Sequence, residues 1–277
     1  MERLSIDLHV HTTASDGTWS PTELVRAAAA KGVSVIAVTD HDTLDGVAEA
    51  TAAGLLHGVE VLPGVEITTE VGPREFHLLG YFVRPEDEAL QEQLATLKNA
   101  RFERGREIVR LLNQLGVAIS FEEVVREAQG GAVGRPHVAR ALFDRGLVSR
   151  SQEAFDRWLG KGRPAYVERY KLSPTEAIEL LLRSRAIPVL AHPGLSGQDA
   201  QIEPLARAGL RGLEVYHTEH SPAMVAHYRA LAERLGLLQT GGSDSHGPRG
   251  TRPIDVGGVV VPDELAERLK QAELAQR

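Results

Sequence analysis

Histidine and carboxylate residues follow short apolar segments of this chain in spacings that suit metal binding. In the first of these segments His9 and His11 are one residue apart, and Asp16 follows five residues later. Because side chains alternate along a strand, both imidazoles point to the same side, and the intervening Thr- and Ser-containing loop can bring Asp16 back to them. Two nitrogen ligands and one carboxylate around a common point would bind a divalent metal. Taken alone, a His-x-His pair is equally consistent with polar residues on an edge strand.

The same placement recurs along the chain, and this recurrence favours a metal centre. Each candidate ligand lies at, or just past, the end of a predicted strand: His9, His11, Asp16, His41, Glu66, His77, His192, Asp244 and His246. Nine such residues are too many for one ion and suffice for two or three, since a Zn-like ion takes three or four protein ligands and a Mn-like ion about six donor atoms. Four of the five remaining histidines lie on or beside predicted helices among charged residues, and we assign them to solvated faces: His57, His217, His220 and His227.

Apolar strands and amphipathic helices alternate through most of the chain. After a first strand beginning at Ile6, strands are predicted over 33–38, 59–68 (interrupted by Pro63-Gly64), 75–81, 187–191, 212–216, 237–240 and 257–261. Ser20-Pro21-Thr22-Glu23 has the pattern of a helix N-terminus with a capping box. Alternation of this kind predicts a parallel α/β barrel, in which ligands bind at the carboxyl ends of the strands.

Residues 99–164 interrupt this alternation and are predicted to form a helical insertion. The barrel would then consist of residues 1–98 and 165–277. The insertion contains 12 Lys/Arg and 8 Asp/Glu, a net charge of +4, whereas the remainder contains 19 and 30, a net charge of −11. A basic insertion on an acidic body suits a cap that binds one or two phosphates and disfavours binding of duplex DNA.

The composition is that of a globular protein of 277 residues, with 42% hydrophobic and 25% charged residues. Cysteine is absent, which excludes disulfides, thiolate metal sites and a cysteine nucleophile. The first residues lack an apolar signal core and no run of 18 apolar residues occurs, so we expect a cytoplasmic protein without a membrane partner. The oligomeric state is left open.

Several motifs together resemble those of the PHP (polymerase and histidinol phosphatase) family. They are Asp7-Leu8-His9-Val10-His11-Thr12 through Asp16-Gly17, Thr39-Asp40-His41, Gly64-Val65-Glu66, His77, Ala191-His192-Pro193 and Gly242-Ser243-Asp244-Ser245-His246. The resemblance implies a distorted (β/α)7 barrel of the PHP type and a trinuclear centre. It assigns one ion to His9, His11, Glu66 and Asp244, a second to Glu66, His77 and His192, and a third to Asp16, His41 and His246.

A Gly-Arg-Pro-His motif, residues 134–137, indicates the substrate. It resembles the insertion motif of nucleoside-3′,5′-bisphosphate phosphatases, also described as 5′-to-3′ exoribonucleases of the RNase AM type. Arg135 is a forked donor on a constrained turn, suited to phosphate, and His137 either binds phosphate or caps the following helix. The implied catalytic residues are Arg135, His192 and Asp244, and the implied substrate-binding residues are Arg135 and His137.

The resemblance implies a metal-dependent phosphoric ester hydrolase in which a metal-bridging hydroxide attacks phosphorus. Its substrates would be nucleoside 3′,5′-bisphosphates, losing the 3′-phosphate, and short 5′-phosphorylated RNA. We expect two or three divalent ions per chain, manganese first, with zinc or iron as alternatives. The rival functions are a phosphatase of histidinol phosphate or another small phosphomonoester, deamination or amide hydrolysis, and a non-catalytic metal-binding module. Asp7 and Asp40 either orient imidazoles or only end their strands.

Overall fold

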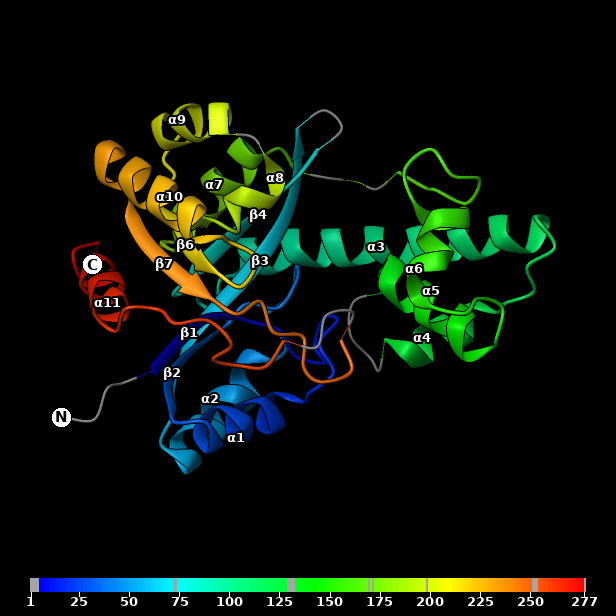
Figure 1. The fold of residues 1–277 in the computed structure, drawn as a ribbon, viewed down its shortest axis with the longest axis horizontal. Helices are drawn as coiled ribbons and strands as arrows, with labels where there is room; N and C mark the ends of the chain where they lie inside the picture. Colours follow the sequence, from blue (N-terminus) through cyan, green and yellow to red (C-terminus); the bar gives the residue numbers. More distant parts are fainter. Residues whose placement is uncertain are drawn as a thin grey trace.

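Seven strands form the centre of the protein in a computed structural model that describes residues 5–71, 74–128, 133–168, 170, 172–197, 199–250 and 254–276. The strands are β1 (Ser5–Val10), β2 (Val33–Val38), β3 (Glu60–Val71), β4 (Arg74–Tyr81), β5 (Ile187–Leu190), β6 (Gly212–His217) and β7 (Leu238–Gly242), adjacent in that order. The first and last strands also approach each other, because the Asp244 amide donates to the His9 carbonyl at 2.9 Å. The sheet is therefore a nearly closed barrel (Figure 1), and the predicted fold class is confirmed.

The barrel is not parallel throughout, and the simple alternation expected from the sequence is wrong at one place. β1, β2 and β3 are parallel, as are β5, β6 and β7, but β4 is antiparallel to both of its neighbours. The chain between Val71 and Arg74 is too short for a crossover helix, so the two long strands can only pair as a hairpin. β3 also continues through Pro63-Gly64 without the expected interruption.

Helices that alternate with the strands in sequence pack around the outside of the barrel (Figure 1). They are α1 (Pro21–Ala30), α2 (Val47–His57), α7 (Pro174–Arg183), α8 (Pro193–Ser196), α9 (Asp199–Arg207), α10 (Pro222–Leu235) and α11 (Glu264–Leu274). The capping box predicted at the start of α1 is confirmed: Ser20 and Glu23 exchange side-chain to backbone hydrogen bonds. No helix within the described ranges combines the length and the apolar character needed to cross a bilayer.

The predicted strand at 257–261 is wrong, because this segment forms a loop. Val261 is buried against the barrel core and Val259 is partly buried there, whereas Val260 is 90% exposed. Gly257 has φ of +74° and its amide donates to Asp7 Oδ2 at 2.7 Å, which turns the chain away from strand geometry. The apolar pattern therefore reflects the burial of Val261 and the partial burial of Val259, but the type of element was predicted incorrectly.

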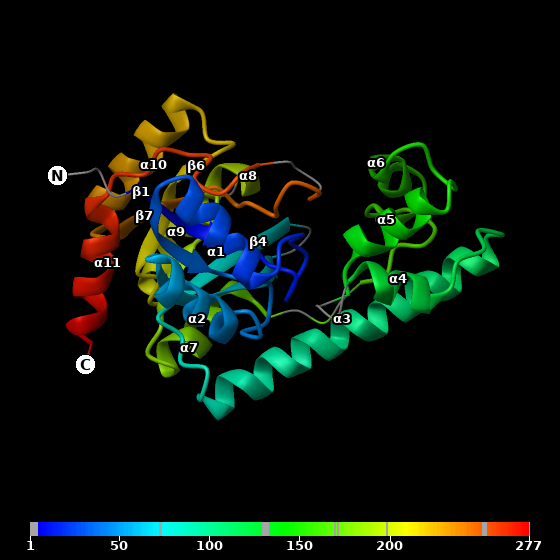
Figure 2. The same cartoon turned by 90° about the horizontal axis from the view of Figure 1, so that it is seen from below.

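A helical insertion projects from one end of the barrel (Figure 1). It contains α4 (Phe121–Glu127), α5 (Arg135–Asp144), α6 (Ser151–Ala154) and a π-helical turn at Phe155–Leu159. The 27-residue α3 (Glu88–Gln114) joins it to the barrel, and Figure 2 shows this helix running beneath both parts. Leu90 and Leu94 of α3 pack in the barrel core, whereas Ile108 and Leu112 pack in a separate core of the insertion. The boundary proposed between residues 98 and 99 thus falls inside one helix.

Candidate metal centre and substrate pocket

The nine residues selected from the sequence converge at one end of the barrel. They come from all strands except β6: His9 and His11 from the end of β1, Asp16 from the next loop, His41 from the end of β2, Glu66 and His77 from within β3 and β4, His192 from the end of β5, and Asp244 and His246 from beyond β7. The side chains form three groups, and within each group the donor atoms lie within 4.8 Å of one another. The groups are His9, His11, Glu66 and Asp244; His41, Glu66 and His77; and His11, Asp16, His41 and His246.

Glu66 lies between two sets of imidazoles and is fully buried. Its Oε1 is 2.8 Å from His77 Nδ1 and 3.2 Å from His192 Nε2. Its Oε2 is 3.3 Å from Nε2 of both His9 and His11. A carboxylate with different nitrogen donors facing each oxygen has the geometry of a ligand shared by two ions.

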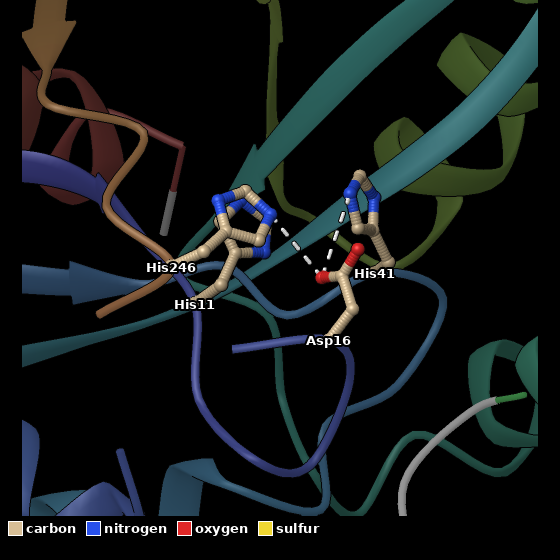
Figure 3. Close-up of side chains that lie close together, drawn as sticks. All are labelled: His11, Asp16, His41 and His246. Atoms are coloured by element: carbon tan, nitrogen blue, oxygen red, sulfur yellow. Dashed lines mark ion pairs between the residues drawn. The ribbon is translucent and has the colours of Figure 1, made fainter. Parts of the chain in front are cut away.

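A second carboxylate, Asp16, organises the outer part of the cluster. Its Oδ1 lies 3.2 Å from His246 Nε2 and 4.0 Å from His41 Nε2 (Figure 3). The rings of His11 and His246 stack beside it with centroids 4.1 Å apart. His41 also reaches Glu66 Oε2 at 3.1 Å, so it is within range of both carboxylates.

Unpaired buried atoms indicate that this cluster is built for cations. Among the described side chains, Asp16 Oδ1 and Glu66 Oε2 are buried without a hydrogen-bond donor. The Nε2 atoms of His9 and His11 are only 3.1 Å apart, a separation at which two lone pairs repel unless a proton or a cation lies near them. Because buried carboxylate oxygens without a hydrogen-bond donor are costly, the nitrogen and oxygen donors here fit divalent ions of the Mn, Fe or Zn type.

The pKa values in the cluster reflect the same mutual attraction. Burial raises the pKa of Glu66, but the surrounding imidazoles of His41, His77 and His9 outweigh burial and hold the pKa well below its usual range. Burial lowers the pKa of His11, but the adjacent carboxylates of Asp244 and Glu66 outweigh burial and raise the pKa to about 10. Metal binding therefore competes with protons at the imidazoles and should release them.

Unusual backbone positions hold the cluster together. A Cβ on Gly242 would lie 2.4 Å from the His9 backbone nitrogen, so only glycine allows β7 to approach β1 this closely. His192 and Asp244 adopt positive φ values of 27° and 55°, which are uncommon for residues with a side chain. Strain of this kind concentrates at functional sites, where surrounding contacts hold it in place.

Glu214 of β6 was not selected from the sequence, although it supports two candidate ligands. It is fully buried, its Oε1 is 3.0 Å from His9 Nδ1, and its Oε2 accepts a hydrogen bond of 2.7 Å from the His192 amide. It therefore leaves His9 Nε2 as the atom facing the cluster. The sequence pattern that marked Glu66 as a candidate is also present at Glu214. Glu214 lies between Leu213 and Val215, just as Glu66 lies between Val65 and Ile67.

The assignment of His217 and His220 to solvated faces is wrong. Both are buried, His217 because β6 extends one residue further than predicted and ends at it. His217 Nε2 lies 3.6 Å from Asp244 Oδ2, and His220 Nε2 accepts a hydrogen bond from the Gly194 amide, in the turn after His192. The two other histidines of this set, His57 and His227, are exposed as predicted.

Asp7 and Asp40 hold backbone loops, and neither makes a hydrogen bond to an imidazole within the described part of the chain. Asp40 accepts from the amide and hydroxyl of Thr12, both at 2.7 Å, and from Ser15 Oγ at 2.6 Å. Asp7 accepts from the Ser243 amide at 2.8 Å. Each carboxylate thus fixes a segment that carries candidate ligands.

We expect Glu214→Gln to weaken metal binding by roughly 10- to 100-fold, the usual effect of losing a carboxylate that orients a metal-binding histidine. The amide preserves the side-chain volume but replaces one of the two acceptor oxygens by an NH2 group, so either the hydrogen bond from His9 or the one from the His192 amide is lost. Titration of metal-free protein with Mn²⁺ would measure the change. Equal affinities for the variant and the natural protein would show that Glu214 only fills space.

A pocket lies between the metal cluster and the insertion, and we call it the first pocket. Asp16, His41 and His77 line one wall, and Arg101, Arg104 and Arg135 line the other. Arg101 donates to Asp42 Oδ2 at 2.6 Å and to Thr68 Oγ1 at 2.9 Å, which ties α3 to the barrel rim. Arg101 and Arg104 were not selected from the sequence, although their i, i+3 spacing places them on one helix face.

The Gly-Arg-Pro-His motif begins α5 beside this pocket. The Arg135 guanidinium carbon lies 5.8 Å from the ring centroid of Tyr166 and 6.0 Å from that of Phe155, which orients the group. His137 Nδ1 accepts a hydrogen bond of 3.0 Å from the Gly134 amide, so His137 caps the helix. Burial lowers the pKa of His137, and in the resulting neutral ring Nε2 carries the proton.

Comparisons with known proteins agree with this geometry. The PHP domain family matches residues 7–168. The chain is 34% identical to the 3′,5′-nucleoside bisphosphate phosphatase of Chromobacterium violaceum, over 91% of this chain and 90% of that protein. It is 35% identical to a 5′-3′ exoribonuclease of Haemophilus influenzae, over 92% and 96%. The crystal structure of a candidate metal-dependent phosphoesterase from Bifidobacterium adolescentis superposes with a TM-score of 0.89 at 30% identity, covering 99% of this chain and 96% of that one.

Proposed function

Since this chain belongs to the PHP domain family and is a phosphoester hydrolase, we propose that it removes the 3′-phosphate from nucleoside 3′,5′-bisphosphates. The observation that carries the proposal is the first pocket, which has candidate metal ligands on one wall and three arginines on the other. A bisphosphate presents two phosphates to such a pocket. One would be attacked at the metal cluster while the other is held by guanidinium groups.

The metal centre would hold two or three divalent ions on the nine residues selected from the sequence. His9, His11, Glu66 and Asp244 would bind one ion, with Glu66 shared with a second. Bound ions of this kind lower the pKa of a water that attacks phosphorus and offset charge on the phosphoryl oxygens. His192 and Asp244 belong to the catalytic set because they would hold these ions next to the reacting phosphate.

The chain's own side chains would orient the substrate. Arg135, stacked near Tyr166 and Phe155, is the candidate anchor for the 5′-phosphate, and its bidentate fork suits a phosphate dianion. Arg101 and Arg104 add positive charge to the same wall. His137 would donate from Nε2, since its Nδ1 is occupied by the Gly134 amide, although it lines a neighbouring pocket that shares Pro136 and not the first pocket itself. No serine or cysteine nucleophile is required.

Short 5′-phosphorylated RNA is the second proposed substrate. Removing the 3′-phosphate of a bisphosphate and releasing the first nucleotide of such an RNA both break the phosphoester on the 3′ side of a nucleotide whose 5′-phosphate is anchored. Relatives named for each activity match more than four fifths of this chain. Aromatic residues make up only 5% of the chain, so we expect little discrimination between bases.

The decisive test compares three substrates at fixed salt with manganese present: adenosine 3′,5′-bisphosphate, adenosine 3′-monophosphate and histidinol phosphate. We expect kcat/KM to be roughly tenfold or more higher for the bisphosphate than for the monophosphate, because one charge-assisted hydrogen-bond pair to the 5′-phosphate contributes at least about 1.5 kcal/mol. Phosphate release measures all three. Zn²⁺ and Fe²⁺ in place of Mn²⁺ would identify the metal preference.

Two results would contradict the proposal. Equal rates on the bisphosphate and the monophosphate would remove the 5′-phosphate anchor. A preference for histidinol phosphate would assign the chain to small phosphomonoesters, the alternative with the same metal chemistry.

A further inference from the structure

A second pocket adjoins the metal cluster at Asp16. Asp16 and Pro136 line both pockets, so the two spaces meet at a candidate metal ligand and the start of α5 separates them. The second pocket lies between the barrel loop at Gly17 and Thr18 and the insertion, from which Arg140 and Arg150 line it. The three arginines of the first pocket are absent from the second, and Arg140 and Arg150 are absent from the first, so a bisphosphate bound in the first pocket does not need Arg140 or Arg150.

We propose that the second pocket binds the part of an RNA chain that lies 3′ to the bond being broken, and that Arg140 and Arg150 contact its phosphates. This inference rests on the proposed function and extends it, because only an oligonucleotide reaches both pockets. The 5′-terminal nucleotide would occupy the first pocket, the phosphate under attack would lie at the metal cluster near Asp16, and the remaining chain would leave past Arg140.

The charges of the second pocket favour this direction. Arg140 donates one hydrogen bond across the cleft to the Arg249 carbonyl and retains other N–H donors, since a guanidinium carries five. Arg150 has 69% of its side chain exposed and lies 3.8 Å from Asp156, so it is free to turn toward a ligand. Two carboxylates also line the pocket; Asp16 belongs to the metal cluster, which leaves the Glu127 carboxylate against the two guanidinium groups.

The other space beside the cluster does not suit a chain of phosphates. It adjoins His77 and His192 on the side of β5 and α8. Its described lining contains no arginine or lysine and includes the Glu75 carboxylate and the partly exposed Leu195. A phosphodiester chain leaving the cluster is therefore attracted to Arg140 and Arg150 and not to this side.

The test uses Arg140→Gln combined with Arg150→Gln, because glutamine keeps polarity and removes the charge. Rates are measured on adenosine 3′,5′-bisphosphate and on a 5′-phosphorylated RNA of six nucleotides. We expect the ratio of kcat/KM for RNA to kcat/KM for the bisphosphate to fall about tenfold. The dependence of log kcat/KM for RNA on log salt should also become shallower, by about 0.7 for each phosphate that the variant no longer neutralises.

Arg145→Gln is the matched control. Arg145 lies in the same insertion, pairs with Glu123 Oε1 at 2.7 Å and lines neither pocket, so its replacement should leave the ratio and the salt dependence unchanged. An unchanged ratio in the double variant, or equal decreases on both substrates, would overturn the inference. A natural protein that hydrolyses the bisphosphate but not the RNA would also overturn it while leaving the proposed function intact. Failure on the bisphosphate itself would instead contradict the proposed function.

Discussion

Replacing Glu66 by alanine is expected to remove more bound metal than the loss of any other single carboxylate and to lower kcat/KM by about a thousandfold or more. The reason is that its two oxygens face different imidazoles, with His77 Nδ1 at 2.8 Å from one and His41 Nδ1 at 3.1 Å from the other. Removing a shared ligand weakens two ion sites together. The effect should exceed the 10- to 100-fold typical of a residue that only orients a ligand.

Elemental analysis of protein loaded with excess metal measures this directly. The natural protein should approach three ions per chain, and Asp16→Ala should lose fewer ions than Glu66→Ala because Asp16 lies in one group only. Glu60→Ala is the matched control, since Glu60 lies on the same strand and pairs with Lys270 at 2.6 Å on the surface. A content of one ion or less, unchanged by either substitution at the cluster, would refute a multinuclear centre.

Arg135→Ala should reduce kcat/KM for the bisphosphate by roughly 1.5–3 kcal/mol, about 10- to 150-fold, and leave the metal content unchanged. This is the range for a charge-assisted hydrogen bond to phosphate. The same variant should lose little on adenosine 3′-monophosphate, because that substrate has no 5′-phosphate to anchor. Steady-state phosphate release on the two substrates, with metal analysis of the same samples, separates binding of substrate from binding of metal.

Arg106→Ala is the matched control for this substitution. Arg106 also lies over two aromatic rings of the insertion, at 5.1 Å from Phe102 and 5.3 Å from Phe121, but it does not line the first pocket. Its replacement should leave both rates unchanged. Metal loss in Arg135→Ala would mean that the residue supports the cluster, and unchanged kinetics would mean that it does not bind substrate.

Most of the candidate ligands could be selected from the sequence because one physical rule covers them; Glu66 and His77 are exceptions, since they lie within β3 and the antiparallel β4 and not at strand ends as predicted. Parallel strands bring their carboxyl ends to one edge, so polar residues at those ends meet even when they are far apart in sequence, as His9 and Asp244 are. Their division among ions could not be derived this way, because it depends on which atoms face each other across the barrel. Glu66 illustrates this, since its position between two sets of imidazoles follows from strand pairing.

The residues and elements that were predicted wrongly from the sequence are those whose role or conformation depends on tertiary contacts. Glu214 resembled an ordinary strand residue until β6 placed it against His9. His217 was missed through an error of one residue at the end of its strand. The segment at 257–261 has the apolar pattern of a strand, yet it packs without pairing. Arg101 and Arg104 line the first pocket because α3 crosses the barrel rim at these residues. The hydrophobic pattern of a helix does not specify where that helix crosses another part of the protein.

The single helix that joins the two cores restricts how a chain of this architecture can change in length over evolutionary time. Leu97 of α3 packs in the barrel, Ile108 packs in the insertion, and Arg101 and Arg104 line the first pocket between them. One residue inserted into this stretch would rotate the insertion by about 100° around the helix axis, and both cores could remain intact while the pocket is destroyed. An insertion of about seven residues, close to two helical turns, would nearly preserve the orientation of the cap around the helix axis. It would still shift the cap outward by about 10 Å. Insertions and deletions should therefore be tolerated at the far end of the cap and not within this segment of α3.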